Sequence, residues 1–567
     1  MNTVKNLIAE AVIASLGEKG AALTVDTVVS MLEYPPDTAM GDIALPCFKL
    51  SRTLRSSPPA IAALIKDGFN CPAVSEANVV GGYLNFKLSG NYLFTDKISE
   101  IISSSSYGSD NRGEGKTVVL DYSSPNVAKP FHIGHLGTTV IGHSLKLIHE
   151  FFGYKCVGIN YLGDWGTQFG KLITAFRLYG NRADIEEGGI DKLVELYVRF
   201  HKEAEEDPSL NDRARAEFRK LEDGDEENLE LWRWFVNISL AEYQKTYRQL
   251  GIEFDSYKGE SFYTDKMPAQ VQILRDKGLL KIDDGASIVD LEEYGMPPCL
   301  ILKRDGSTLY PTRDIAAAVY RKQTYDFDKA IYVTSAGQSL HFAQWFKVVE
   351  MMGYDWFDGL VHVPYGTVSI NGAKLATRSG NVVLLKDLFA EAIEKVNGII
   401  AEKNPNLENR EETAEAVGVG AIVFHYLSGG RIKDINFMIE DALSFEGNTG
   451  PYAQYTYARC ASILSKCGEI EEVSGEVDLC EEERQLSIAL CRFPEVVSAA
   501  IRDYEPSTIT RYILDVCAAF NRFYHNCPIV NKEDKRTTAI RVQLTKATKK
   551  LIGTSLELIC VKHPEKI

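Results

Sequence analysis

The hydrophobic periodicity of this chain changes near Lys386, and the change limits the folds that the sequence can adopt. Before this residue, short apolar stretches typical of strands alternate with amphipathic helical stretches and glycine-bearing turns. After it, apolar residues recur almost only with the 3.6-residue period of an α-helix. Strands that alternate with helices predict a parallel sheet covered by helices, whereas a purely helical sequence predicts a bundle. We therefore predict an α/β multidomain protein in which a parallel-sheet part is followed by an all-α bundle.

Individual strands and helices are expected from the same pattern. Five stretches should be strands of the parallel sheet: residues 117–122, 156–161, 300–303, 329–334 and 361–370. A highly charged helical stretch at about 180–250 interrupts them and is interpreted as an insertion. Five amphipathic stretches in the last third should be helices: residues 414–426, 452–464, 482–500, 508–525 and 538–559.

With 567 residues the chain is too long for a single hydrophobic core, so several domains are expected. Residues 103–113 are rich in serine and glycine and mark a linker after an N-terminal α+β domain. The expected domains are an N-terminal domain at 1–112, a parallel-sheet domain at 113–385 with its helical insertion at about 180–275, a connecting helical region at 386–445 and a helical domain at 446–567.

Composition excludes some classes of protein and leaves others open. No apolar run approaches the ~20 residues of a membrane-spanning helix, and the N-terminal stretch is an amphipathic helix rather than a targeting segment, so we expect a cytoplasmic protein with no membrane partner. None of the eleven cysteines forms a Cys-x-x-Cys pair, so no structural zinc is expected. The net charge of −16 does not exclude nucleic-acid binding, because phosphate contact depends on a local basic face. The basic tail at 541–567 fits either such a face or a solvated helix surface.

The most informative segment, residues 118–137, predicts a strand, a polar loop and a helix that begins near His132. Ligands of open α/β sheets bind at the carboxyl ends of strands, and a helix N-terminus there attracts phosphate. His132 and His135 flank Gly134 in the first turn, where imidazoles can donate to phosphate oxygens and a glycine leaves room for a flat base. The usual glycine-rich nucleotide loops are absent from the sequence, so a nucleotide bound here is held by another device.

His132-Ile-Gly-His135 resembles the HIGH motif of class I aminoacyl-tRNA synthetases, and the whole string from Ser123 to His135 is similar to arginyl-tRNA synthetases in particular. Further segments match that family in the same order: Pro36-Asp-Thr-Ala-Met-Gly-Asp-Ile-Ala-Leu-Pro46, Gly163-Asp-Trp-Gly-Thr-Gln-Phe-Gly170, Tyr310-Pro-Thr-Arg-Asp314, Gln338-Ser-Leu-His341 and Gly447-Asn-Thr-Gly-Pro-Tyr-Ala-Gln-Tyr455. The resemblance implies a Rossmann-like catalytic domain, an N-terminal domain that binds the tRNA elbow and a C-terminal anticodon-binding bundle. It also implies a monomer that ligates L-arginine to tRNA-Arg through an arginyl-adenylate, uses ATP with Mg²⁺, and activates arginine only when tRNA is bound.

The resemblance assigns residues to ATP and to catalysis. The implied ATP contacts are Lys129, Phe131, His132, Gly134, His135 and Lys374. The family's second ATP motif, KMSKS, is present as Lys374-Leu-Ala-Thr-Arg378, in which Thr377 replaces the second lysine. In relatives with this change a lysine just upstream of HIGH is thought to supply the missing charge, and Lys129 stands at that position. The implied catalytic residues are His132, His135, Lys129, Lys374 and Arg378. How the last three share the phosphate role stays open, because the planar guanidinium of arginine is not equivalent to the compact ammonium of lysine.

Selection of arginine and of tRNA requires further groups. A guanidinium presents five donors in a rigid fork, so its pocket needs carboxylates. By resemblance the arginine-binding residues are Asp121, Ser124, Asn126, His132, Tyr310, Asp314 and Gln338. The hypothesis requires Asp121 and Asp314 to converge beside the HIGH turn, although some relatives carry glutamate at the first position. Single-stranded anticodon bases stack on aromatic rings, and the candidate rings are Tyr452, Tyr455 and Tyr524, whereas Phe520 and Phe523 fit a core position better.

Three alternative hypotheses about the function stay open. Another class I synthetase would lack the guanidinium carboxylates. A small-molecule adenylate-forming ligase on the same fold would need no helical C-terminal third. A non-catalytic tRNA-binding paralogue would not need the complete motif at His132–His135, and the altered loop at Lys374 is the one feature that favours it.

Overall fold

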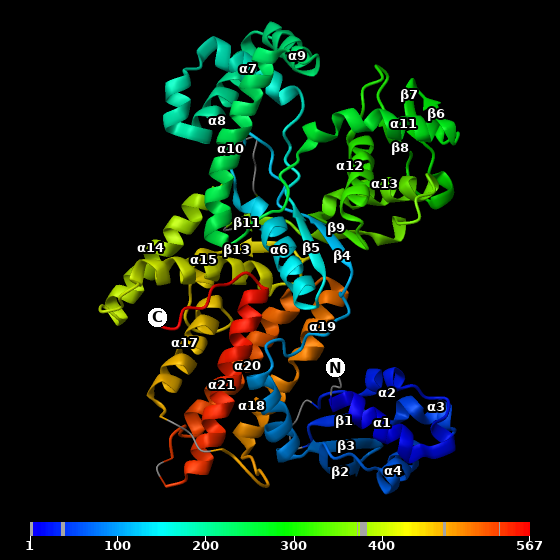
Figure 1. The fold of residues 1–567 in the computed structure, drawn as a ribbon, viewed down its shortest axis with the longest axis vertical. Helices are drawn as coiled ribbons and strands as arrows, with labels where there is room; N and C mark the ends of the chain where they lie inside the picture. Colours follow the sequence, from blue (N-terminus) through cyan, green and yellow to red (C-terminus); the bar gives the residue numbers. More distant parts are fainter. Residues whose placement is uncertain (1–3, 36–39, 371, 375–382, 469–471, 532) are drawn as a thin grey trace.

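A computed structural model of the chain describes residues 4–35, 40–370, 372–374, 383–468, 472–531 and 533–567. The molecule is elongated, with a helical unit at one end, a parallel sheet in the middle, and a helical bundle and an N-terminal domain side by side at the other end (Figure 1). No helix of the described residues is both long enough and apolar enough to cross a membrane.

The central sheet has four parallel strands in the order β10-β9-β4-β5. Its strands are β4 (Thr117–Asp121), β5 (Lys155–Ile159), β9 (Lys329–Ser335) and β10 (Leu360–Tyr365). Leu120 of β4 lies in register with Gly158 of β5 and Ile331 of β9. The residues of β4 after Thr117 are buried, because helices cover the sheet on both faces. The helices around the sheet are α6 (Leu136–Phe151), α11 (Met267–Asp276), α12 (Tyr310–Tyr325) and α13 (Ser339–Met351). The predicted parallel-sheet fold is confirmed.

Two strand predictions were wrong in detail. Residues 300–303 fall in β8 (Cys299–Leu302), which pairs antiparallel with β7 (Ala286–Val289) in a separate sheet that also contains β6 (Leu280–Asp283). A short apolar run indicates that a segment is buried, but it does not indicate which sheet the segment joins. Residues 361–370 divide into β10 and β11 (Val368–Ile370) at Gly366, where a side chain would meet the carbonyl oxygen of Lys433 at 2.5 Å. Beyond this break β11 pairs with β13 (Ile435–Phe437) and with β12 (Ala373–Lys374).

Two helical regions frame the sheet (Figure 1). The insertion between β5 and β6 contains α7 (Thr167–Tyr179), α8 (Arg182–Glu206), α9 (Ser209–Glu222) and α10 (Glu226–Leu250). The C-terminal part contains α14 (Leu385–Lys403), α15 (Arg410–Ser428), α16 (Ile439–Ala442), α17 (Gly450–Lys466), α18 (Glu481–Cys491), α19 (Phe493–Asp503), α20 (Ser507–Asn526) and α21 (Lys535–Leu558). The stretch predicted as one helix at 482–500 is two helices, because Pro494 in the first turn of α19 cannot continue the hydrogen bonding of α18.

The N-terminal domain packs helices against a three-stranded antiparallel sheet in the order β1-β3-β2. Its elements are α1 (Val4–Leu16), α2 (Val25–Met31), β1 (Ile43–Pro46), α3 (Ser51–Leu54), α4 (Pro58–Gly68), β2 (Val74–Val80), β3 (Tyr83–Leu88) and α5 (Ser99–Ser103). A buried ion pair between Asp42 and Arg484 joins this domain to α18. Arg484 also donates to the carbonyl oxygen of Leu88 at 2.6 Å, so the junction is held by charge-assisted hydrogen bonds.

Candidate active site

The predicted HIGH turn lies at the carboxyl end of β4 and leads into α6. Residues Ile133–His135 form a short 3₁₀ turn that His132 caps. The Nδ1 atom of His132 accepts a hydrogen bond from the amide of Gly134 at 3.1 Å, and the Nδ1 atom of His135 accepts one from the amide of His132 at 3.1 Å. Because each Nδ1 is an acceptor, each neutral ring carries its proton on Nε2. The turn therefore offers two imidazole N–H donors.

The charge state of these rings follows from their surroundings. Burial lowers the pKa of His135 to about 3, with a further contribution from His132, and the His135 ring stacks on Phe131 with centroids 5.0 Å apart. Burial and the positive charge of Lys129 lower the pKa of His132 as well. Both imidazoles are therefore neutral hydrogen-bond donors at pH 7.

The segment after the second predicted ATP motif pairs with the HIGH turn. The amide of Leu385 donates to the carbonyl oxygen of Phe131 at 3.0 Å, and the amide of Ile133 donates to that of Val383 at 3.2 Å. The predicted residue Arg378 lies outside the described residues, and for Lys374 only the backbone, in β12, is described. The structure thus brings the segment that follows the motif next to the turn.

The loop between β4 and the turn is strained and buttressed by α10. Ser123, Ser124 and Ala128 have positive φ values of 70°, 48° and 60°, which side-chain-bearing residues rarely adopt. The hydroxyl of Tyr243 on α10 lies 2.7 Å from the carbonyl oxygens of both Asn126 and Lys129. The side chains of these two predicted site residues are exposed, so the buttress fixes their backbone and leaves their polar ends accessible.

The carboxylate of Asp121 is already bonded to two other residues of the chain. Its Oδ2 atom lies 2.8 Å from Nη1 of Arg321 on α12, and its Oδ1 atom accepts a hydrogen bond from Ser124 Oγ at 2.9 Å. Arg321 is only 1% exposed. Although burial alone would lower the pKa of Arg321, Asp121 raises it well above the ordinary value. A resident guanidinium therefore stands where a substrate guanidinium was expected.

Asp314 and a carboxylate that the sequence did not single out, Glu260, lie close together. Asp314 on α12 lies 2.6 Å from Nε2 of His341, and Glu260 lies 2.6 Å from Nη1 of Arg313. Burial raises the pKa of Glu260 to about 7; Arg313 opposes this rise, and the negative charge of Asp314 adds to it. Nothing local marks Glu260, because it begins a 3₁₀ turn far from the other site residues in sequence.

The two predicted carboxylates also lie near each other. Burial raises the pKa of the Asp121 carboxyl, and the negative charge of Asp314 adds to that rise. The charges of both carboxylates likewise add to the rise in the pKa of the buried Tyr332 hydroxyl. Tyr310, in the first turn of α12, is 66% exposed, and Gln338 is exposed just after β9. The carboxyl ends of β4 and β9 and the start of α12 therefore bring the predicted arginine-binding residues to one edge of the sheet.

The predicted anticodon-facing rings lie on neighbouring helices of the bundle. The guanidinium of Arg459 lies over the rings of Tyr455 and Tyr524, 4.9 Å and 5.3 Å from their centroids. Both tyrosines are substantially exposed, at 40% and 42%. The Tyr452 hydroxyl accepts a hydrogen bond from Asn521 at 2.7 Å and is less exposed. As expected, Phe520 and Phe523 are fully buried. Tyr455, Arg459 and Tyr524 thus form an exposed aromatic–arginine cluster between α17 and α20.

Comparison with known proteins identifies the families that match each part of this chain. The family described as "tRNA synthetases class I (R), catalytic domain" matches residues 97–439, the "Arginyl tRNA synthetase N terminal domain" matches 2–88, and the "DALR anticodon binding domain" matches 453–567. The chain is 50% identical over 544 residues to an arginine–tRNA ligase of Alkaliphilus metalliredigens, which covers 95% of this chain and 96% of the relative. It is 48% identical over 568 residues to one of Clostridium botulinum, with 99% and 100% covered.

A solved structure supports the same comparison. The chain is similar over its full length to the arginyl-tRNA synthetase of Thermus thermophilus, with a TM-score of 0.84, 26% sequence identity and 100% of each chain covered. The similarity includes the N-terminal domain, the sheet and the bundle together, because neither chain has an uncovered part.

Proposed function

Since the chain belongs to the arginyl-tRNA synthetase family and is an arginine–tRNA ligase, we propose how the described side chains carry that reaction. In the first step, a carboxylate oxygen of L-arginine attacks the α-phosphorus of ATP and pyrophosphate leaves. In the second step, a hydroxyl of the terminal ribose of tRNA-Arg attacks the arginyl carbonyl carbon and AMP leaves. Both steps bring anions or electron-rich oxygens together, so positioning and stabilisation of phosphoryl charge dominate catalysis.

We assign the phosphate-facing role to the HIGH turn, and one observation carries this assignment. The backbone amides of His132 and Gly134 bind the Nδ1 atoms, so the Nε2–H groups of His132 and His135 are the donors that remain for phosphate. As neutral donors they do not need to lose a proton before or after binding. Lys129 brings positive charge beside both rings, as its effect on their pKa values indicates. The ring of Phe131 stacks on the His135 ring and restricts its orientation.

The remaining contacts to ATP are proposed from family membership. Gly134 leaves space for the base, and Lys374 and Arg378 contribute charge from the second motif, next to the segment that pairs with the turn. Mg²⁺ enters as the complex of the ATP substrate.

For arginine selection we propose that Asp314 and Glu260 accept hydrogen bonds from the substrate guanidinium. Arg313 approaches the Oε2 atom of Glu260, and the other oxygen is the acceptor that we assign to the substrate. Asp121 is a positioning residue in this proposal, because its contacts hold Ser124 and Arg321 rather than the ligand.

The polar groups around these carboxylates complete the arginine site. We place the α-amino and carboxylate groups of the substrate beside Ser124, Asn126 and His132, on the loop that Tyr243 buttresses. Tyr310 and Gln338, exposed at the same edge of the sheet, close the pocket over the bound substrate.

For tRNA we propose that the cluster of Tyr455, Arg459 and Tyr524, with Tyr452 beside it, stacks on anticodon-loop bases. The N-terminal domain at 1–112 contacts the elbow of the tRNA, and the helical domain at 446–567 holds the anticodon stem. The enzyme acts as a cytoplasmic monomer and activates arginine only when tRNA-Arg is bound.

Exchange of labelled pyrophosphate into ATP tests this proposal. The purified chain is given ATP and each proteinogenic amino acid in turn, with or without tRNA-Arg. Exchange is expected with arginine alone and only when tRNA-Arg is present. Exchange with another amino acid would contradict the substrate assignment, and exchange with arginine in the absence of tRNA would contradict the coupling.

A further inference from the structure

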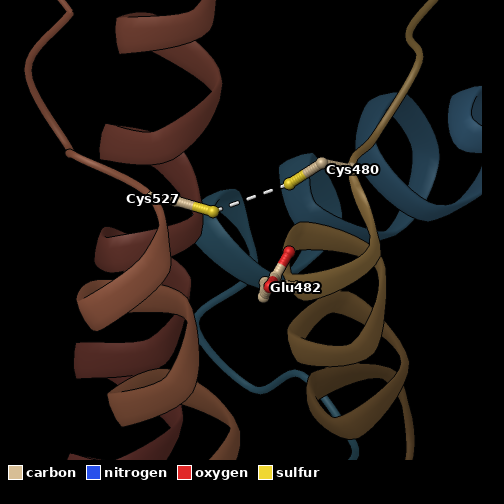
Figure 2. Close-up of side chains that lie close together, drawn as sticks. All are labelled: Cys480, Glu482 and Cys527. Carbon is tan, nitrogen blue, oxygen red and sulfur yellow. Dashed lines mark hydrogen bonds between the residues drawn. The ribbon is translucent and has the colours of Figure 1, made fainter.

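Three side chains of the kinds that bind metal ions cluster where α18 begins and α20 ends, far from the active site (Figure 2). Cys480 precedes the first turn of α18, Glu482 lies in that turn, and Cys527 directly follows α20. One ligand atom of each side chain lies within 4.8 Å of the others, and the two sulfur atoms are 3.6 Å apart. Of the described residues, no other group of three His, Cys, Asp or Glu side chains converges in this way.

We propose that Cys480, Cys527 and Glu482 bind a thiophilic divalent cation, Zn²⁺ in the first instance. Two thiolates at tetrahedral angles, with Zn–S bonds of about 2.3 Å, place their sulfur atoms about 3.8 Å apart. The observed 3.6 Å matches this edge closely. A disulfide would require about 2.05 Å, and both cysteines are free. The existing separation therefore accommodates an ion with little movement.

The third ligand is already oriented. Asn526, the last residue of α20, donates from Nδ2 to Oε1 of Glu482 at 2.9 Å, which turns the carboxylate toward the end of α20 where Cys527 lies. Such hydrogen bonds to a ligating carboxylate are the usual way in which a metal site fixes its ligands. Cys527 is buried, whereas Cys480 is exposed, so an ion can enter from solvent and water can complete its coordination.

An ion at this position would stabilise the junction between the bundle and the N-terminal domain. The same turn of α18 carries Glu483, which bonds Arg541 of α21 at 2.7 Å, and Arg484, which pairs with Asp42 of the N-terminal domain. By joining the start of α18 to the end of α20, the ion restrains the turn from which both contacts project. The sequence argument against zinc considered only local spacing, whereas these two cysteines are 47 residues apart.

Cadmium titration of the full-length, reduced and chelator-treated protein tests the proposal, because cadmium–thiolate complexes have a charge-transfer absorption in the ultraviolet. We expect absorption that saturates at one equivalent of Cd²⁺ and is displaced by Zn²⁺. Cys480→Ser, a change at an exposed position, should abolish it while aminoacylation stays at the wild-type rate. Glu482→Gln should weaken binding at least about tenfold. Cys467→Ser, at a cysteine outside the cluster, is the matched control and should bind as the wild type does.

Three outcomes would overturn the proposal: no saturable binding at one equivalent, absorption that persists in Cys480→Ser, or loss of binding in Cys467→Ser as well. Formation of a Cys480–Cys527 disulfide by the reduced protein in air, without uptake of the ion, would also overturn it. Intact-mass measurement before and after thiol alkylation distinguishes that outcome from metal binding.

Discussion

The affinity for arginine should depend on pH through Glu260. Burial raises the pKa of this carboxyl to about 7, so it gains its negative charge within the physiological range rather than well below it. A substrate guanidinium binds the ionised form, because the neutral acid has lost its charge and half of its acceptor capacity. The KM for arginine is therefore expected to fall as pH rises from 6 to 8 and to level off above 8.

The magnitude follows from the ionised fraction. With a pKa of about 7, about a tenth of the Glu260 carboxyl groups are ionised at pH 6 and about nine-tenths at pH 8, so KM should change by about tenfold between these values. Glu260→Gln removes the charge at every pH. It should raise KM at pH 8 by the loss of one charge-assisted hydrogen bond, ~1.5–3 kcal/mol or about 10- to 150-fold, and should abolish the change that the wild type shows between pH 6 and 8.

The assay is steady-state aminoacylation at saturating ATP and tRNA-Arg, with arginine varied at pH 6, 7 and 8. Glu292→Gln, a matched change at an exposed glutamate, should keep the wild-type pH dependence. The ratio of variant to wild-type KM at each pH removes any titration of ATP, arginine or tRNA that both proteins share. If that ratio is the same at pH 6 and pH 8, the assignment of Glu260 to the guanidinium is refuted.

Three further predictions concern other parts of the site. Asp314→Asn should raise the KM for arginine about 10- to 150-fold and leave the KM for tRNA unchanged, as measured by aminoacylation; a change below threefold would contradict its role. Gly163→Ala should also raise the KM for arginine, because the added methyl would meet Oδ1 of Asn126 at 2.1 Å and displace that amide, whereas Gly429→Ala, which has open space, should be neutral. Tyr524→Ala should weaken tRNA binding by the ~1–3 kcal/mol that one stacked base contributes, which is measured as a higher KM for tRNA. Arginine kinetics at saturating tRNA should not change, and an unchanged KM for tRNA would exclude the ring from the interface.

The sequence by itself determined the local units of this protein. The strands β4, β5 and β9 begin and end within two residues of their predicted limits, because a buried parallel strand must be an uninterrupted apolar run. The HIGH turn could also be located from the sequence, because its capping histidines and the helix that follows them are neighbours along the chain. Helices of the last third were found from their apolar stripes, although the break before Pro494 was not.

Only the tertiary structure decided which of these units face one another. The apolar run of β8 did not show that it would join a separate antiparallel sheet, because periodicity reports burial and not the neighbour that provides it. The same limit applied to charge. Asp121 was correctly placed at the end of a strand, but its partner, Arg321, lies on a helix 200 residues later in the sequence.

The electrostatic character of the arginine pocket was decided in the same way. Glu260 has no local signal, and its pKa is raised because folding buries it near the carboxylates of Asp314 and Asp164. Cys480 and Cys527 likewise meet only through the packing of the bundle. Spacing along the chain sets which side chains can share a turn or a strand, whereas the partner of a buried charge or thiol depends on how distant elements pack.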